Sequence, residues 1–157
     1  MKAMILAAGL GTRIQPLTKG LPKALAKVEN KPLLELVIKK LIHFGYRQII
    51  VNVHHQAEMI VDFLQRNKNF GIDIMISDES SQLLNTGGGI WNASWFFDSS
   101  KPFLIHNTDV LSNIDLNELL AYHKQYEAIA TLCVRPREAS RYLWFDRSMQ
   151  LCGWENP

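Results

Sequence analysis

Residues 6–35 read LAAGLGTRIQPLTKGLPKALAKVENKPLLE, and this stretch decides the fold class and the chemistry that the sequence predicts. It continues from an apolar run typical of a strand buried on both faces of a parallel sheet. Gly9 and Gly11 follow, and they allow backbone N–H groups to approach an anion without a Cβ in the way. Arg13 adds a planar fork for phosphate oxygens, and Lys23 adds a mobile positive charge. The stretch therefore predicts a triphosphate-binding loop at the start of an α/β domain.

Two other phosphate loops are excluded by the residues of this stretch. A dinucleotide fingerprint needs a third glycine where the chain has Ile14, which argues against an NAD-dependent dehydrogenase. A P-loop ends in Gly-Lys-Ser or Gly-Lys-Thr, and neither occurs in the sequence. A Gly-x-Gly pair alone also fits an ordinary tight turn between a strand and a helix. The longer pattern favours phosphate binding, and it comprises Arg13, Pro16-Leu17-Thr18, Pro22-Lys23 and Lys31-Pro32.

The whole stretch resembles the N-terminal signature of the sugar-1-phosphate nucleotidylyltransferases, L-A-A-G-x-G-T-R-x-x-P-L-T followed by P-K and K-P-x-x-E. Residues 84–90, LNTGGGI, are similar to the L-x-T-G-G-G-I segment of N-acetylmuramate-1-phosphate uridylyltransferases and related hexose-1-phosphate enzymes. Asn107-Thr108-Asp109 and residues 151–157 extend the resemblance over the whole chain. It implies one nucleotidyltransferase domain over residues 1–157, an α/β domain with a Rossmann-like, doubly wound, mostly parallel sheet.

The resemblance also implies a nucleotide site. Its residues are Leu6, Ala7, Ala8, Gly9, Gly11, Thr12, Arg13, Lys23, Thr86, Gly87 and Gly88. Arg13 and Lys23 are the catalytic residues: Arg13 and the loop N–H groups hold the β- and γ-phosphates, and Lys23 approaches the α-phosphate. Thr86 and its glycines contact the base and ribose. The alternative for that segment is a flexible helix N-terminus without a ligand.

Asp109 is the candidate metal ligand. It follows an apolar strand, so its carboxylate is expected at the edge of the sheet. A carboxylate there can hold Mg²⁺, which keeps several waters and binds one or two protein oxygens together with substrate phosphate. The alternative is an ordinary turn aspartate. The nearby phosphate loop favours the metal, whereas His106 is expected to be a packed strand residue.

The implied reaction forms an NDP-sugar and pyrophosphate from a nucleoside triphosphate, with UTP favoured, and a sugar-1-phosphate. It is a Mg²⁺-assisted in-line displacement in which positioning and charge neutralisation dominate. Two alternatives stay open: a guanylyltransferase acting on mannose- or heptose-1-phosphate, and a non-catalytic domain that senses nucleotide or sugar. The family's second metal-binding aspartate and part of its sugar pocket lie beyond the point matching Pro157, so we expect a C-terminally truncated domain. Homo-oligomerisation stays open, and Ala26, in place of the family's proline, predicts a slightly looser loop.

Composition excludes several classes of partner. The chain has 157 residues, 47% of them hydrophobic, and a formal net charge of +2, which is too small to indicate nucleic acid binding. No apolar run approaches the length of a membrane span, and no secretion signal follows Met1, so we expect a cytoplasmic protein without membrane contact. Cys133 and Cys152 stand in apolar contexts, which predicts buried thiols rather than a disulfide or metal pair.

Hydrophobic periodicity predicts alternating strands and helices. The strands are expected at residues 2–7, 47–53, 72–76, 103–106, 128–134, 142–145 and 151–154. The helices are expected around residues 34–42, 60–64, 87–97 and 115–123. Because ligands bind beyond the carboxyl ends of parallel strands, residues 9–13, 54–55 and 107–109 are expected to meet at one edge.

Other polar and aromatic residues favour structural roles. His54 and His55 fit a loop at a strand end better than a shared metal site, because neighbouring strand residues point to opposite faces. Glu35 fits either a contact that orders the phosphate loop or the exposed side of a helix. The four tryptophans, Trp91, Trp95, Trp144 and Trp154, are expected in the core or at an interface rather than as base-stacking platforms.

Overall fold

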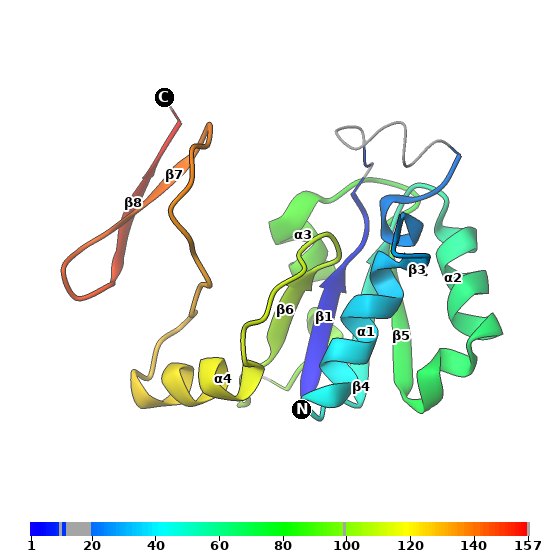
Figure 1. The fold of residues 1–157 in the computed structure, drawn as a ribbon, viewed down its shortest axis with the longest axis horizontal. Helices are drawn as coiled ribbons and strands as arrows, with labels where there is room; N and C mark the ends of the chain where they lie inside the picture. The colour runs from blue at the N-terminus through cyan, green and yellow to red at the C-terminus, as the bar shows by residue number, and fades with distance from the viewer. Residues whose placement is uncertain (10, 12–19, 99, 157) are drawn as a thin grey trace. The chain divides into compact units, whose positions relative to one another are not determined.

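The computed structural model describes residues 1–9, 11, 20–98 and 100–156 (Figure 1). Thr12 and Arg13 lie outside the described residues. The chain divides into two compact units, Met1–Leu116 and Asn117–Pro157, and each is described by itself. The first unit contains the predicted phosphate loop, the glycine-rich segment and Asp109, so the candidate site is built within that unit.

The first unit is organised around a four-stranded sheet with the order β5-β4-β1-β6. Its strands are β1 (Lys2–Leu6), β4 (Gln48–Val53), β5 (Asp73–Asp78) and β6 (Leu104–Asn107). Every neighbouring pair is parallel. The chain steps from β1 outward to β4 and β5 and then returns to the other side of β1 for β6. This reversal is the switch point of a doubly wound sheet, and the expected fold class is confirmed.

The segments that connect these strands form helices, because the apolar residues of those segments recur at helical spacing. They are α1 (Leu33–His43), α2 (Ala57–Arg66) and α3 (Asn85–Asn92), and a 3-10 turn, η4 (Ser94–Phe96), follows α3. In α1 the stripe of Leu34, Val37, Ile38 and Leu41 is fully buried. The helix ends before Gly45, whose φ of 83° suits glycine at this position. The expected helices near residues 34–42 and 60–64 are therefore confirmed.

Both faces of the sheet are covered, which explains the continuous apolar runs in β1 and β4. Met4 and Ile50 pack on one face with Ala93 and Phe96, from the region of α3 and η4. Their strand neighbours alternate to the opposite face, on which α1 lies in Figure 1. Ala3, Ile5, Ile49 and Val51 are among these fully buried neighbours.

A short segment between β1 and α1 fixes the backbone around Lys23. It contains a 3-10 turn, η2 (Lys23–Leu25), and a small hairpin of β2 (Lys27–Val28) and β3 (Lys31–Pro32). Ala26 has a φ of −57°, which proline also adopts, yet its N–H donates to the Lys23 carbonyl (3.1 Å). Proline could not make this hydrogen bond. Ala26 therefore closes the η2 turn with its own backbone N–H.

The second unit consists of one helix and one hairpin. Helix α4 (Leu116–Gln125) begins at the last residue of the first unit, and β7 (Tyr142–Phe145) pairs antiparallel with β8 (Leu151–Glu155). The connecting turn is held by Asp146, whose Oδ1 accepts from the N–H groups of Ser148 (2.8 Å) and Gln150 (2.9 Å). The strand expected at residues 128–134 is wrong: the segment is irregular in the structure.

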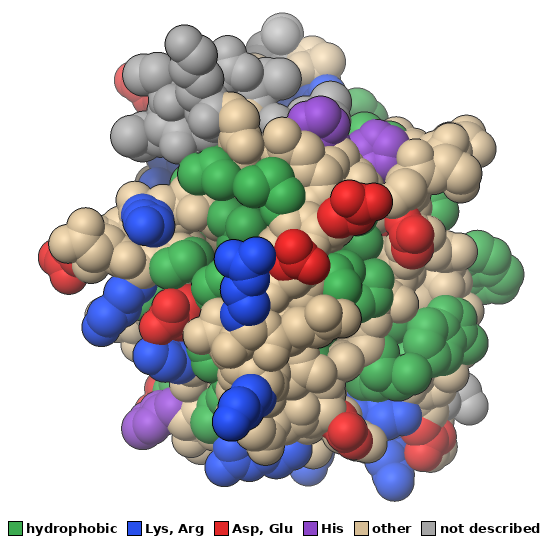
Figure 2. All heavy atoms as spheres, turned by 90° about the vertical axis from the view of Figure 1, so that its right-hand side faces the viewer, with side chains coloured by type: hydrophobic (Ala, Val, Ile, Leu, Met, Phe, Trp, Pro, Cys, Tyr) green, Lys and Arg blue, Asp and Glu red, His purple; other side chains and the backbone are tan. Residues whose placement is uncertain are grey.

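The expectation that Cys133 and Cys152 are buried is wrong, because both are exposed. The four tryptophans, Trp91, Trp95, Trp144 and Trp154, are all more than half exposed, so their expected place in the core is wrong, and the alternative of an interface stays a prediction. On the face drawn in Figure 2, Lys and Arg side chains are interspersed with Asp and Glu. Within the described part of the chain, no helix is both long and apolar enough to cross a bilayer.

Candidate functional site

The candidate site lies where β1, β4 and β6 end side by side. In the sheet register, Leu6 stands opposite Asn52 on one side and opposite Asn107 on the other. The carboxyl ends of parallel strands at a switch point form a crevice in which ligands bind. The segments after β1 and β6 are therefore brought together, as the sequence predicted.

The loop after β1 is anchored at its first two residues. The Leu6 carbonyl accepts from the Thr108 hydroxyl (2.5 Å) and more weakly from the Thr108 N–H (3.3 Å). The Ala7 N–H donates to Asn52 Oδ1 (2.8 Å). Ala8 is buried, and a Cβ at Gly9 would meet open space. These contacts hold the loop entry while leaving room beside Gly9, and nucleotide contact by Leu6, Ala7 and Ala8 stays a prediction.

Gly11 has a φ of 68°, the left-handed backbone region that favours glycine. Its conformation explains the residue type at this position independently of any ligand. The predicted roles of Thr12 and Arg13 fall on residues outside the described ranges.

Lys23 and Asp109 meet at this edge although they are 86 residues apart, with Nζ 2.5 Å from Oδ2. The neighbours of Lys23 in η2, Ala24 and Leu25, are buried and anchor the turn that presents it. Asp109 follows the buried Thr108, which is bonded to β1. The side chains are partly exposed, 19% for Lys23 and 45% for Asp109, so both heads stay accessible from solvent. The two residues that the sequence singled out separately thus form one charged pair.

The chemistry of this pair suits a metal–phosphate ligand. A lysine ammonium is a point charge for phosphate oxygens, and a single carboxylate is sufficient for Mg²⁺ when substrate phosphates and water complete its shell. Among the described residues, no group of three or more His, Cys, Asp or Glu side chains could hold a metal. The donor set around Asp109 therefore fits a hard cation held largely by substrate and water rather than a closed protein site.

The glycine-rich segment lies at the start of α3. The helix begins at Asn85, so Gly87, Gly88 and Gly89 lie within its first turns rather than before it. A Cβ at Gly87 would meet no atom within 4 Å. A Cβ at Gly89 would lie 2.6 Å from Glu79 Oε1 and 2.9 Å from Asn52 Nδ2. Gly89 is thus required by packing, whereas packing does not explain Gly87.

A buried polar chain at this edge was missed by the sequence reasoning. Asn52 and Glu79 are 2% and 1% exposed, and Asn52 Nδ2 donates to Glu79 Oε1 (2.7 Å). Glu79 Oε2 accepts from the Leu84 N–H (3.3 Å), just before α3. The available signal was Asn52 itself, a polar residue inside the apolar run of residues 49–53.

The histidines have structural roles. His54 follows β4, and its Nδ1–H donates to the Glu79 carbonyl (2.7 Å), so the loop position expected for His54 and His55 is confirmed. The His106 Nδ1–H donates to the Asn107 carbonyl (2.8 Å). Burial lowers the pKa of His106 below its ordinary value, against a smaller opposing effect of that hydrogen bond. His106 is thus a packed strand residue, as predicted.

Two further acidic residues have identified partners. Asp78 ends β5, and hydrogen bonds from Ser80, first from its hydroxyl and then from its N–H, lower the pKa of Asp78. Glu35 pairs with Lys39 one turn later in α1 (2.6 Å), and its side chain is only 17% exposed. A contact of Glu35 that orders the phosphate loop stays a prediction, because Arg13 lies outside the described residues.

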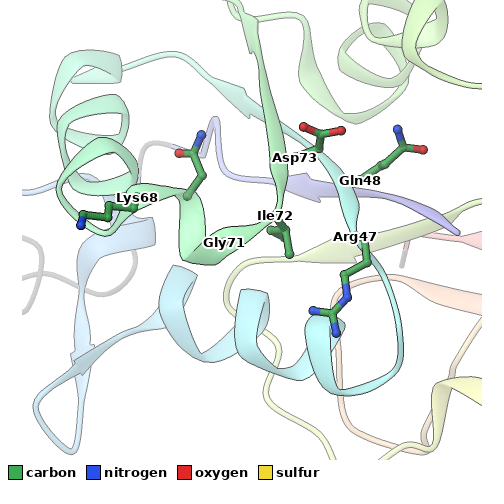
Figure 3. Close-up of a pocket in the computed structure, with 7 residues that line it drawn as sticks. Arg47, Gln48, Lys68, Gly71, Ile72 and Asp73 are labelled. Atoms are coloured by element: carbon green, nitrogen blue, oxygen red, sulfur yellow. The ribbon is translucent and has the colours of Figure 1, made fainter.

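A separate pocket lies at the opposite edge, where β4 and β5 begin (Figure 3). It is open and has a volume of about 520 Å³. Arg47 and Lys68 lie on opposite sides of it in Figure 3, so their charges do not converge. The residues that line it are Arg47, Gln48, Lys68, Asn69, Gly71, Ile72 and Asp73. None of the predicted site residues is among them.

Comparison with known families and curated proteins agrees with the geometry. The family model for nucleotidyl transferase matches residues 2–142. A UTP–glucose-1-phosphate uridylyltransferase of Synechocystis is 36% identical over 146 residues, covering 86% of this chain and 37% of that protein. The catalytic subunit beta of a mannose-1-phosphate guanylyltransferase of Danio rerio is 32% identical over 144 residues, covering 90% and 40%. The chain thus spans about two-fifths of the length of these curated relatives.

Solved structures share the fold. HddC from Yersinia pseudotuberculosis, in a complex with GMP-PN, superposes with a TM-score of 0.76 at 22% identity, covering 98% of this chain and 68% of that one. A UDP-glucose pyrophosphorylase complexed with UDP-glucose gives a TM-score of 0.65 at 19% identity, covering 80% and 54%. At these identities the likeness establishes the fold alone.

Proposed function

The chain belongs to the nucleotidyl transferase family, and we propose that it binds a nucleoside triphosphate at the carboxyl edge of its first unit and transfers the nucleotidyl group to a sugar-1-phosphate. The observation that carries the proposal is the Lys23–Asp109 pair, whose members come from separate segments and meet at 2.5 Å beside the switch point. UTP is the favoured nucleotide, and the Synechocystis relative is named as a UTP-dependent enzyme.

Lys23 and the phosphate loop provide the positive charge for the reaction. The Lys23 ammonium binds oxygens of the α-phosphate, while Arg13, Thr12 and the N–H groups beside Gly9 and Gly11 bind the outer phosphates. An anionic oxygen of the sugar phosphate attacks the α-phosphorus as the bond to the pyrophosphate oxygen breaks. The attacking oxygen is already ionised at neutral pH, and the leaving oxygen departs as part of the pyrophosphate anion. No protein base is therefore needed, and catalysis consists of positioning and charge stabilisation.

Asp109 holds the metal in this proposal. Mg²⁺ fits a site with one protein carboxylate, because it keeps several waters and takes its remaining ligands from phosphate. When bound, the metal neutralises charge on the phosphate oxygens. Asp109 Oδ2 lies within contact distance of Lys23 Nζ (2.5 Å), so the carboxylate also orients the ammonium toward the same phosphate.

The start of α3 is the proposed binding segment for the base and ribose. Thr86, Gly87 and Gly88 lie in its first turn, and the space beside Gly87 is open. The absence of a side chain there allows a flat base to approach the backbone. This role rests on the resemblance and on the open space at Gly87, since close contacts require glycine at Gly88, 2.9 Å from Leu84 Cβ, and at Gly89.

The test is pyrophosphate release by this chain with Mg²⁺, in which UTP and GTP are each paired with a panel of sugar-1-phosphates that includes glucose, mannose and N-acetylmuramate phosphates. Release with one pair, lost in Lys23→Ala, supports the proposal and identifies the substrates. Binding of nucleotide without release supports the nucleotide site and contradicts transfer by this chain. Neither binding nor release contradicts the proposal.

A further inference from the structure

Glu79 has no part in the proposed chemistry, yet its carboxylate is almost completely buried at the candidate site. We propose that Glu79 is a positioning residue that, through Asn52, ties the entry of the phosphate loop to the start of α3. The connection runs from the Ala7 N–H to Asn52 Oδ1 (2.8 Å), from Asn52 Nδ2 to Glu79 Oε1 (2.7 Å), and from the Leu84 N–H to Glu79 Oε2 (3.3 Å). This chain of bonds is called the Asn52–Glu79 clamp.

The polarity of the clamp explains why one member is a carboxylate. Both of its ends are backbone N–H donors, at Ala7 and Leu84. The side-chain amide of Asn52 accepts from Ala7 through Oδ1 and donates to Glu79 through Nδ2, so Glu79 receives a hydrogen bond from this side as well. Glu79 therefore faces two donors and must accept with both oxygens, which an ionised carboxylate does and an amide cannot.

Because the clamp is buried, each of its donors must face an acceptor. Taking a carboxylate out of water is unfavourable unless hydrogen bonds compensate it. The Glu79 side chain is also held through its own backbone, because its N–H donates to the Val53 carbonyl (2.8 Å) and its carbonyl accepts from His54 Nδ1 (2.7 Å). The carboxylate is thus fixed between β4 and the segment leading to α3.

Gly89 fits closely against the clamp. A Cβ there would lie 2.6 Å from Glu79 Oε1 and 2.9 Å from Asn52 Nδ2, so α3 approaches to a distance that only glycine allows. The clamp thereby sets the spacing between the loop after β1 and the glycine-rich turn. These are the two segments assigned to phosphate and base in the proposed function, on which this inference rests. A change in the clamp alters nucleotide binding without removing any group that touches the nucleotide.

The clamp is tested by reversing its polarity. Glu79→Gln places an amide opposite two donors, and Asn52→Asp places two carboxylates side by side. The double variant Asn52→Asp/Glu79→Gln restores every donor–acceptor match: the carboxylate at position 52 accepts from Ala7 and from the new amide, whose oxygen accepts from Leu84. Glu58→Gln removes an exposed carboxylate in α2 and is the matched control.

Two readouts are needed: the affinity for Mg²⁺–UTP by calorimetry, and the exchange of the Ala7 and Leu84 amide protons by NMR without nucleotide. We expect Glu79→Gln to lose at least about tenfold in affinity and to speed exchange at Leu84, because hydrogen bonds to a charged acceptor are lost. We expect the double variant to return to within about threefold of the wild-type affinity, about 0.7 kcal/mol. Glu58→Gln should match the wild type in both readouts.

The outcomes separate the clamp from the proposed function. A double variant no better than Glu79→Gln, or a Glu79→Gln protein with wild-type affinity and exchange, overturns the clamp. A wild-type chain that binds neither UTP nor GTP overturns the proposed function, and the exchange rates at Ala7 and Leu84 then decide the clamp by themselves.

Discussion

Two glycines of one helical turn are expected to respond in opposite ways to the same substitution. In Gly89→Ala, the new Cβ would lie 2.6 Å from Glu79 Oε1 and 2.9 Å from Asn52 Nδ2, both held by hydrogen bonds in the buried clamp. Overpacking of this kind costs about 1–3 kcal/mol, and we expect the upper end because neither atom can move without weakening a bond. The higher helix propensity of alanine stabilises the helix by about 1 kcal/mol, so the net loss in the free energy of unfolding is about 2 kcal/mol.

Gly87→Ala is the matched control, because nothing lies within 4 Å of its Cβ position. Only the higher helix propensity of alanine then acts, so the free energy of unfolding should be unchanged or raised by up to about 1 kcal/mol. At about 2–4 °C per kcal/mol for a chain of this size, Gly89→Ala should melt about 4–8 °C below the wild type.

The assay for this pair is thermal unfolding followed by circular dichroism, with calorimetric titration of Mg²⁺–UTP on the folded proteins. Gly87→Ala should lose nucleotide affinity without losing stability, because its methyl group would fill the space proposed for the base. Equal melting temperatures for the two variants would refute the packing argument. Wild-type affinity in Gly87→Ala would refute the assignment of the base to this turn.

Four further substitutions test the charged pair, the buried histidine and the core. Lys23→Ala and Asp109→Ala should each abolish pyrophosphate release, and turnover near wild type in either variant contradicts their roles. Each should lower the melting temperature by only about 2–4 °C, because a partly exposed ion pair contributes at most about 1 kcal/mol. Burial lowers the pKa of His106 below 6.5, so the unfolded chain takes up a proton first, and stability should fall as the pH drops through about 6.5. His106→Gln should flatten this part of the melting profile, and an unchanged profile would show that another group is responsible. The lowered pKa of Asp78 affects stability only in the more acid range, around and below its ordinary value of 3.8. Leu34→Ala should cost about 2–5 kcal/mol in urea unfolding, because Leu34 is fully buried in the stripe of α1, and a loss under 1 kcal/mol would contradict that packing.

Much of the first unit could be predicted because its signals are local. Parallel strands covered on both faces appear as unbroken apolar runs, which located β1 and β4. The stripe of α1 and the glycine after it located that helix. The rule for parallel sheets predicted that residues 107–109 lie beside the loop after β1, but it did not predict the contact of Asp109 with Lys23, which lies 86 positions away in η2.

The remaining features depend on partners that a single segment does not reveal. Residues 128–134 have strand-forming side chains, yet they pair with no strand in the described chain, and strand propensity depends on such pairing. Cys133 lies in the same segment, so the prediction of its burial was wrong for the same reason. The Asn52–Glu79 clamp joins a strand residue to a loop 27 positions later, and only Asn52 stood out in the sequence, as a polar residue within an apolar run.

The central claim is that Lys23 and Asp109 form a site for a metal-bound nucleoside triphosphate at the switch point of the sheet. The most direct measurement is calorimetric titration of UTP and GTP into this chain with and without Mg²⁺, repeated with Lys23→Ala and Asp109→Ala. We expect nucleotide binding that Mg²⁺ strengthens, a strong loss of affinity in Lys23→Ala, and loss of the Mg²⁺ effect in Asp109→Ala. No binding by the wild type, or equal affinities in all three proteins, would contradict this claim.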